Sequence, residues 1–168
     1  MNIHVETHPY LPDKYSKYAD EEFKREGNPV VSFPIAFEHI PAGAKTLALT
    51  LIDHDAVPVC GFSWIHWTAA NIPAHIGELP ENASDERQDL MVQGQNSFAS
   101  PLAGLKNPKI IHQYCGPMPP DQDHIYTLTV YALDDALDLQ AGFYLNDFYQ
   151  SIKGHVLTKS VLEIKRRV

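Results

Sequence analysis

The sequence predicts a mostly antiparallel β-sandwich with one C-terminal helix and long loops rich in proline and glycine. Several apolar or alternating runs are separated by turns, and the chain contains 13 prolines and 9 glycines. Strong helical periodicity occurs once, at residues 145–156, where apolar residues recur every three or four positions. At 168 residues, the chain is expected to form a single domain spanning residues 1–168.

The first half of the chain predicts one short helix and two strands. Residues 19–25 suit a helix of one or two turns that ends at Gly27. Residues 30–37 resemble a strand, although Pro34 favours an edge or a bulge. Residues 47–52 are apolar throughout except for one threonine, which indicates a strand buried on both faces.

The next strand is expected at residues 62–68, where aromatic and β-branched residues dominate. Side chains alternate between the two faces of a strand. This alternation places Trp64 and His66 on one face and Trp67 on the other.

The second half of the chain predicts two further strands around the helix. The run from 124 to 133 alternates, so His124 and Tyr126 share one face while Ile125 lies on the other. Residues 160–165 are expected to form a short final strand.

Composition argues against several classes of general partner. The formal net charge of −8 argues against nucleic acid and anionic membranes. Residues 1–10 lack the apolar core of a signal peptide, and no apolar run is long enough for a transmembrane segment, so a cytoplasmic location is expected. Cys60 and Cys115 fit no metal-ligand spacing and are expected to be free thiols. No cofactor is expected.

In the sequence, acidic and histidine residues occur near the ends of the predicted strands. Asp53 and Asp55 follow one strand, His66 lies on the next, and His124 begins a third. A carboxylate beside an imidazole fixes its tautomer and raises its pKa, so two such histidines would offer N–H donors that suit phosphate. Trp64, Tyr114 and Tyr126 are expected to form the walls of this pocket. Gly116 would allow the backbone to approach a ligand closely. Taken singly, each of these features is more common as an ordinary turn or a structural histidine.

Four motifs occur in order along the chain: Asp-His-Asp-Ala-Val-Pro at 53–58, His-Trp at 66–67 with Asn-Ile-Pro at 71–73, Gly-Pro-Met-Pro-Pro at 116–120, and His-Ile-Tyr at 124–126. Together they resemble the phosphatidylethanolamine-binding protein family, also called Raf kinase inhibitor proteins, in its bacterial-type branch. The resemblance extends over nearly the whole chain. The sequence departs from the family pattern at His54, where the family has proline, and at Ile125, where it has arginine.

The resemblance implies a β-sandwich of this family's type with a small anion pocket at one end. It assigns ligand binding to Asp53, Asp55, Trp64, His66, Gly116, His124 and Tyr126, with Tyr114 as a further wall residue. The implied function is non-catalytic binding of small phosphate esters or phosphorylated groups, similar to phosphoethanolamine. The family name also implies regulation of a protein partner such as a kinase, but the sequence identifies no kinase-contacting surface. The oligomeric state, a homodimer among the alternatives, is left open.

Two other functions remain as alternatives. A hydrolase could bind a divalent metal through Asp53, Asp55, His66 and His124, or use Cys115 as a nucleophile near His124. A protein-interaction module could retain the fold with a vestigial pocket.

Overall fold

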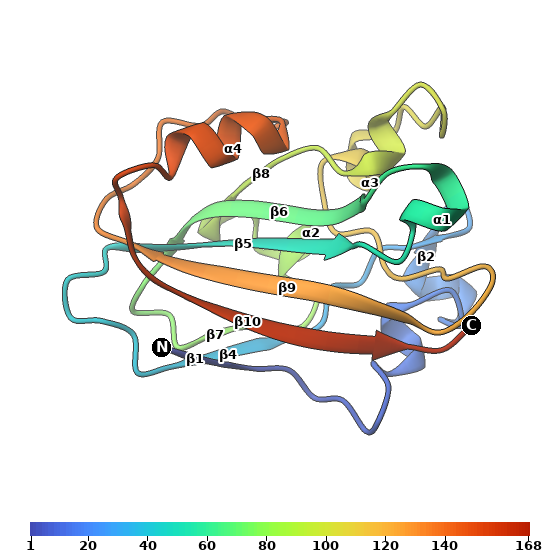
Figure 1. Ribbon diagram of the computed structural model, residues 1–168, viewed down its shortest axis with the longest axis horizontal. Coiled ribbons are helices and arrows are strands. Elements are labelled where there is room, and N and C mark those ends of the chain that lie inside the picture. Colours follow the sequence, from blue (N-terminus) through green and yellow to red (C-terminus); the bar gives the residue numbers. More distant parts are fainter.

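The computed structural model describes all residues, 1–168, and confirms the mostly β, antiparallel architecture (Figure 1). Its strands are β1 (Asn2–His4), β2 (Lys24–Arg25), β3 (Asn28–Pro29), β4 (Ile35–Glu38), β5 (Thr46–Asp53), β6 (Trp64–Pro73), β7 (Glu78–Leu79), β8 (Val92–Gln93), β9 (His124–Leu133) and β10 (Val156–Arg166). The α-helices are α1 (Val57–Cys60), α2 (Ala83–Glu86), α3 (Pro108–Ile111) and α4 (Leu145–Ser151). Short 3-10 turns cover Asp13–Tyr15, Glu21–Phe23, Gln88–Leu90 and Ser97–Ala99.

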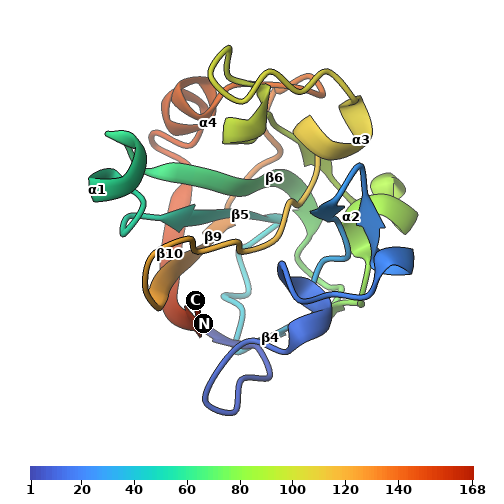
Figure 2. The same ribbon diagram turned by 90° about the vertical axis from the view of Figure 1, so that its right-hand side faces the viewer.

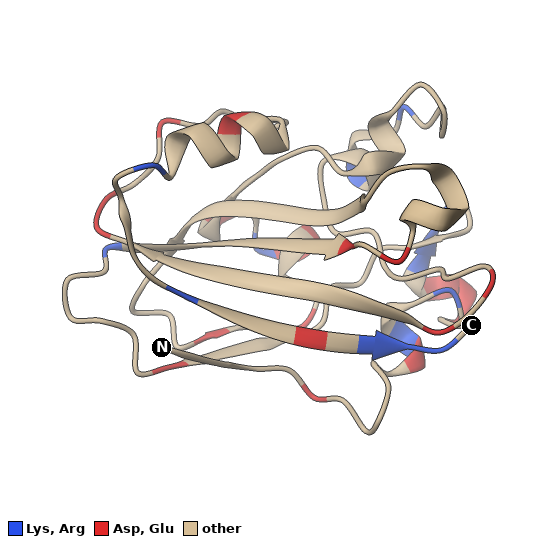
Figure 3. Cartoon of the chain, viewed as in Figure 1, with Lys and Arg blue, Asp and Glu red and all other residues tan.

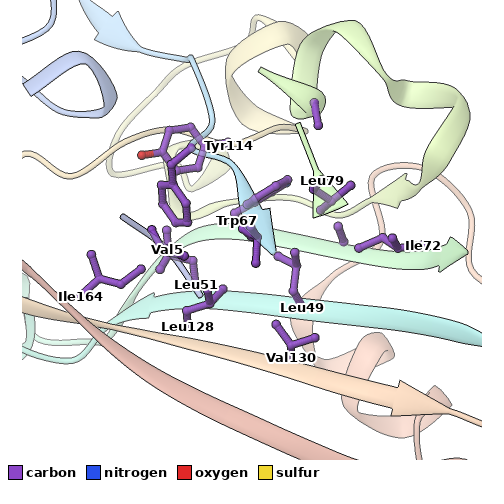
Figure 4. Close-up of a cluster of buried hydrophobic side chains, with 14 of the residues drawn as sticks. Val5, Leu49, Leu51, Trp67, Ile72, Leu79, Tyr114, Leu128, Val130 and Ile164 are labelled. Carbon is purple, nitrogen blue, oxygen red and sulfur yellow. The ribbon is translucent and has the colours of Figure 1, made fainter. Parts of the chain in front are cut away.

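Two antiparallel sheets form the sandwich. The larger sheet has the strand order β10-β9-β5-β6-β8, and the smaller has the order β1-β4-β7. A cluster of 22 buried residues fills the space between them, with Trp67, Leu49 and Leu51 near its centre (Figure 4). The β2–β3 hairpin and the loops that follow it close one end of this core (Figure 2).

The central position of strand β5 in the large sheet explains why its residues are apolar on both faces. All eight of its residues are buried, and it pairs with β6 on one side and β9 on the other. Its odd-numbered leucines enter the main core, whereas Ala48 enters a second cluster of nine residues beneath α4. A central strand covered on both faces has no solvent side for polar residues.

The C-terminal helix is shorter than the sequence predicts. Helix α4 ends at Ser151, and Gly154 turns the chain with φ +84°, a conformation that favours glycine. The final strand therefore begins at Val156 and contains 11 residues, which is longer than the predicted 160–165. No helix combines the length and apolar character needed to cross a bilayer.

Two predictions near the N-terminus are wrong in part. The helix expected at 19–25 is one 3-10 turn followed by β2, because Glu26 and Gly27 both have positive φ and join β2 to β3 in a two-residue hairpin. The strand expected at 30–37 is reduced to β4, which begins directly after Pro34.

Candidate functional site

A cavity of about 220 Å³ lies at the end of the large sheet where β5 ends and where β6 and β9 begin. Helix α1 and the segment before β9 border it, on the right in Figure 1 and facing the viewer in Figure 2. Eleven residues line the cavity, and seven of them are hydrophobic. Small-molecule pockets typically combine apolar walls with a few polar groups in this way.

Five of the eight predicted site residues line this cavity: Asp53, Trp64, His66, His124 and Tyr126. Strand pairing explains how three of them meet. Asp53 is the register partner of Trp64 on β6 and also of Tyr126 on β9. The three side chains therefore form one row across adjacent strands, on the same face of the sheet.

His66 reaches the cavity through a β-bulge. Leu51 pairs with Trp67, but the next residue of β5, Ile52, pairs with Ile65, so His66 is the extra residue on β6. Strict alternation is interrupted here. The prediction that Trp67 lies on the face opposite His66 is therefore wrong, because Trp67 pairs with Leu51 and packs in the same main core.

Three predicted residues do not line the cavity. Asp55 instead accepts a hydrogen bond from the backbone N–H of Ile125 at 2.8 Å, which ties the end of β5 to β9. Tyr114 is fully buried in the core, and its hydroxyl donates to the carbonyl of Tyr15 at 2.6 Å. Gly116 lies against Tyr15 too, since a Cβ there would approach the same carbonyl oxygen to 2.3 Å. Each of the three therefore makes contacts with other parts of the protein outside the cavity lining.

Asp53 and His124 form a buried pair at the cavity wall. Oδ2 of Asp53 accepts from Nδ1 of His124 at 2.8 Å, while Oδ1 accepts the N–H of Ala56. The other nitrogen of His124, Nε2, donates to Asp121 at 2.9 Å. Figure 3 shows acidic residues at the end of β5 and in the loop before β9, the two segments that supply these carboxylates.

The two carboxylates decide the charge of His124. Burial by itself lowers the pKa of this imidazole, but the hydrogen bonds to Asp53 and Asp121 outweigh that effect, and the pKa is raised. His124 therefore favours the protonated form that balances the buried charge of Asp53.

The pKa of His66 is shifted in the opposite direction to that of His124. Its Nδ1 donates to the carbonyl of Cys115 at 2.7 Å, and burial lowers its pKa more than this bond and the charge of Asp53 raise it. The sequence suggested that both histidines offer free N–H donors to the pocket. The structure corrects this picture, because both nitrogens of His124 are bonded to carboxylates and the neutral form of His66 presents Nε2 as a lone pair.

Aromatic rings form much of the remaining wall. Trp64 packs edge-on against Phe98 with centroids 5.0 Å apart, and Tyr126 packs edge-on against His66 at 5.1 Å. The hydroxyl of Tyr126 is buried close to the carboxylate of Asp53, and burial followed by the charge of that carboxylate raises its pKa. It therefore stays protonated and available as a donor.

Sequence reasoning missed several residues at the cavity. Phe98 and Cys60 line it, as do Met118 and Pro120. The last two belong to the Gly-Pro-Met-Pro-Pro motif, so the motif itself was the available signal. Phe98 ends the segment Gln-Gly-Gln-Asn-Ser-Phe at 93–98, which weakly resembles the family pattern, but the segment has no periodicity that would indicate its place at the cavity.

The groups proposed for hydrolysis are not arranged for that chemistry. No group of three or more His, Cys, Asp or Glu side chains is placed to hold a metal ion. Cys115 is fully buried, and burial raises the pKa of its thiol, which disfavours the nucleophilic thiolate. The thiol of Cys60 donates to the carbonyls of Ala56 and Phe62.

Comparisons with known proteins agree with the motifs and the fold. The family model described as phosphatidylethanolamine-binding protein matches residues 2–167. The Bacillus subtilis protein YxkA is 75% identical over 168 residues, which is the full length of both chains. A UPF0098 protein of Methanothermobacter thermautotrophicus is 37% identical over 134 residues, covering 79% of this chain and 80% of the relative.

Two crystal structures resemble the whole chain. A structure from Chlamydia trachomatis, described as a homolog of phosphatidylethanolamine-binding protein, superposes with a TM-score of 0.77 and 29% identity, covering 99% of this chain and 96% of the other. Escherichia coli YbcL, described as a new member of the mammalian family, gives a TM-score of 0.75 at 23% identity, covering 99% and 97%. The latter similarity concerns the fold alone.

Proposed function

Because this chain belongs to the phosphatidylethanolamine-binding protein family, we propose that its cavity binds small phosphate-containing anions or phosphorylated groups similar to phosphoethanolamine, without catalysis. The observation that carries the proposal is the convergence of Asp53, His66, His124 and Tyr126 on one small, mostly apolar cavity. These side chains come from three different strands.

The electrostatic arrangement supports an anion at this place. A free buried carboxylate would repel it, but the charge of Asp53 is balanced by His124 at 2.8 Å. The hydroxyl of Tyr126 is buried in the wall of the cavity beside Asp53 and keeps its proton, so it can act as a donor there. A phosphoryl oxygen would satisfy that donor.

The size and walls of the cavity favour a head group over a larger molecule. Its volume of about 220 Å³ lies below the roughly 300 Å³ at which pockets for drug-sized ligands begin. Trp64 and Phe98 form an aromatic wall on one side. Aromatic faces attract cations, so an ammonium group beside the phosphoryl group would find a suitable surface.

The proposal is tested by NMR titration of the histidine side chains with phosphoethanolamine. The ring resonances of His66 and His124 are expected to shift and then saturate, while those of His75, which is exposed and distant in sequence from the cavity motifs, stay unchanged. If His66 and His124 remain unmoved at millimolar ligand, the proposed function is wrong.

A further inference from the structure

The two edges of the large sheet differ in how their backbone is covered. At the β8 edge, the N–H of Gly142 donates to the carbonyl of Gln93 at 2.8 Å. The N–H of Gln95 similarly donates to the carbonyl of Phe143 at 2.8 Å, so a later segment of the chain covers this edge. Strand β10 forms the other edge and pairs only with β9 (Figure 1). An edge strand with unpaired backbone groups is a template for another strand.

The open part of the β10 edge comprises residues 159–163. The carbonyl of Lys165 accepts from the N–H of Leu11 at 2.9 Å, so the backbone groups of Lys165 point away from β9. Pairing with β9 is regular from 158 to 166, and alternate residues of an antiparallel strand direct their backbone groups to the same side. The residues whose N–H and C=O groups therefore point outward, with no other backbone partner, are Lys159, Val161 and Glu163. The bulge at Leu157 limits this open segment at one end, and the bond to Leu11 limits it at the other.

The outward side chains of the open segment are exposed and carry opposite charges. Lys159, Val161 and Glu163 alternate with less exposed residues, and Val161 is 55% exposed. Figure 3 shows charges of both signs along β10. Neither Lys159 nor Glu163 takes part in an ion pair within the protein. Ser160 points to the opposite face, where its hydroxyl donates to the carbonyl of Met1. The order Lys, Val, Glu at alternate positions is complementary to itself when a second copy of the strand runs in the opposite direction.

We propose that a second copy of this chain docks on the open edge, with the two β10 strands antiparallel about a two-fold axis at Val161. Lys159 then lies opposite the partner's Glu163, Glu163 lies opposite the partner's Lys159, and the two valines meet at the axis. Each of these three residue pairs exchanges two N–H···O=C hydrogen bonds, because the backbone groups of all three residues point toward the second strand. The contact is isologous, as a closed two-fold assembly requires, and it joins the two large sheets into one. None of these residues lines the cavity, so the inference does not depend on the proposed function.

Charge selects this register over the neighbouring ones. Opposite charges on directly opposed residues stabilise an antiparallel pair, and like charges destabilise it. A shift by two residues in one direction would place Lys159 opposite the partner's Lys165. A shift by two residues in the other direction would place Lys159 opposite the partner's Val161, so its charge would have no direct counterpart. Of these three registers, only the one centred on Val161 pairs each charge with its opposite.

Charge reversal tests the proposal by sedimentation equilibrium of the whole chain, at protein concentrations from micromolar to millimolar. The wild type is expected to approach twice the mass of one chain as the concentration rises. Lys159→Glu places carboxylates opposite one another on both sides of the axis, and it is expected to raise the dissociation constant at least about tenfold. The double variant Lys159→Glu with Glu163→Lys restores opposite charges and is expected to recover dimerisation.

The matched control is Lys106→Glu, which makes the same change of charge at an exposed lysine outside the sheet. This variant is expected to dimerise as wild type. A wild-type protein that stays monomeric at millimolar concentration would overturn the proposal. So would a Lys159→Glu protein that dimerises normally, or a double variant that fails to recover.

Amide hydrogen exchange followed by NMR locates the contact in the wild-type protein. The amides of Lys159, Val161 and Glu163 are expected to exchange more slowly as the protein concentration rises, because carbonyls of the second strand then accept from them. The amides of Ser160 and Leu162 point toward β9 and are expected to be protected at every concentration. A dimer in which the amides of residues 159, 161 and 163 remain unprotected would use another surface, and the proposal would be wrong.

Discussion

Oδ2 of Asp53 and Nδ1 of His124 lie 2.8 Å apart although the residues are separated by 71 positions in the chain. The two side chains are 5% and 1% exposed, so the pair has almost no contact with solvent. It joins the last residue of β5 to the first residue of β9, at the edge of the cavity. The same contact therefore contributes to stability and sets the charge of the candidate site.

Replacing Asp53 with asparagine should destabilise the protein. The substitution removes the buried carboxylate that pairs with His124 and leaves only the more exposed Asp121, and breaking a buried pair of this kind costs about 3–5 kcal/mol. The matched variant Asp135→Asn breaks a solvent-exposed pair with Lys45 and should cost far less. Urea denaturation at pH 6 measures both free energies of unfolding. Equal losses of unfolding free energy in the two variants would show that the buried pair contributes no more to stability than the exposed pair.

Acid stability should depend on His66. Burial lowers its pKa in the folded state below the unfolded value of about 6.5, so its contribution is present above that value and is lost as the pH falls below it. The raised pKa of His124 acts in the opposite direction, since its contribution is present at low pH and is lost as the pH rises through its folded value.

The variant His66→Asn should consequently lose less stability than wild type between pH 7 and pH 5. Removing the His66 imidazole is expected to reduce the pH dependence of the free energy of unfolding by at most about 1.4 kcal/mol per pH unit, at pH values below the unfolded pKa. Urea denaturation at several pH values measures it. Parallel stability curves for the two proteins would contradict the lowered pKa of His66.

The carboxylate of Asp121 should be one cause of the raised pKa of His124. The variant Asp121→Asn is therefore expected to lower the pKa of His124, as followed by NMR titration of its ring. Asp123→Asn removes a charge two residues further on, where the carboxylate contacts Tyr10 and Lys165 instead. An equal shift of the pKa in both variants would indicate a general charge effect rather than the direct hydrogen bond.

Gly116 should be required for packing against Tyr15. A Cβ at this position would lie 2.3 Å from the carbonyl oxygen of Tyr15, a clash with backbone that cannot be relieved by a side-chain rotation. Gly116→Ala is expected to lower the free energy of unfolding by about 1–3 kcal/mol. At Gly43 a Cβ would make an ordinary 3.7 Å contact with Leu157, so Gly43→Ala should differ little from wild type. A neutral Gly116→Ala would contradict the close approach.

Ligand binding should be visible in the fluorescence of one of the two tryptophans. Trp64 lines the cavity, whereas Trp67 is fully buried in the core. Titration with phosphoethanolamine is expected to change the emission of wild type, and Trp64→Phe should abolish the change while keeping the emission of Trp67. A change that survives in Trp64→Phe would place the ligand elsewhere.

Much of the fold could be read from local patterns. The strand predicted at 124–133 is β9 to the residue, because its first six residues alternate between buried and more exposed positions. The apolar run of β5 likewise predicted a strand covered on both faces. The short helix at 19–25 was wrong because a hairpin with two positive φ angles depends on contacts that helical propensity does not describe.

The sequence by itself determined the central strands β5 and β9, the burial of β5 and the motifs that carry Asp53, His66 and His124. Only the tertiary structure decided which atoms of these residues face the cavity. The bulge at His66 depends on the register between β5 and β6, and the bonds of both histidines depend on segments distant in the chain. Register and long-range hydrogen bonds arise when the whole core packs, so no local pattern of residues contains them.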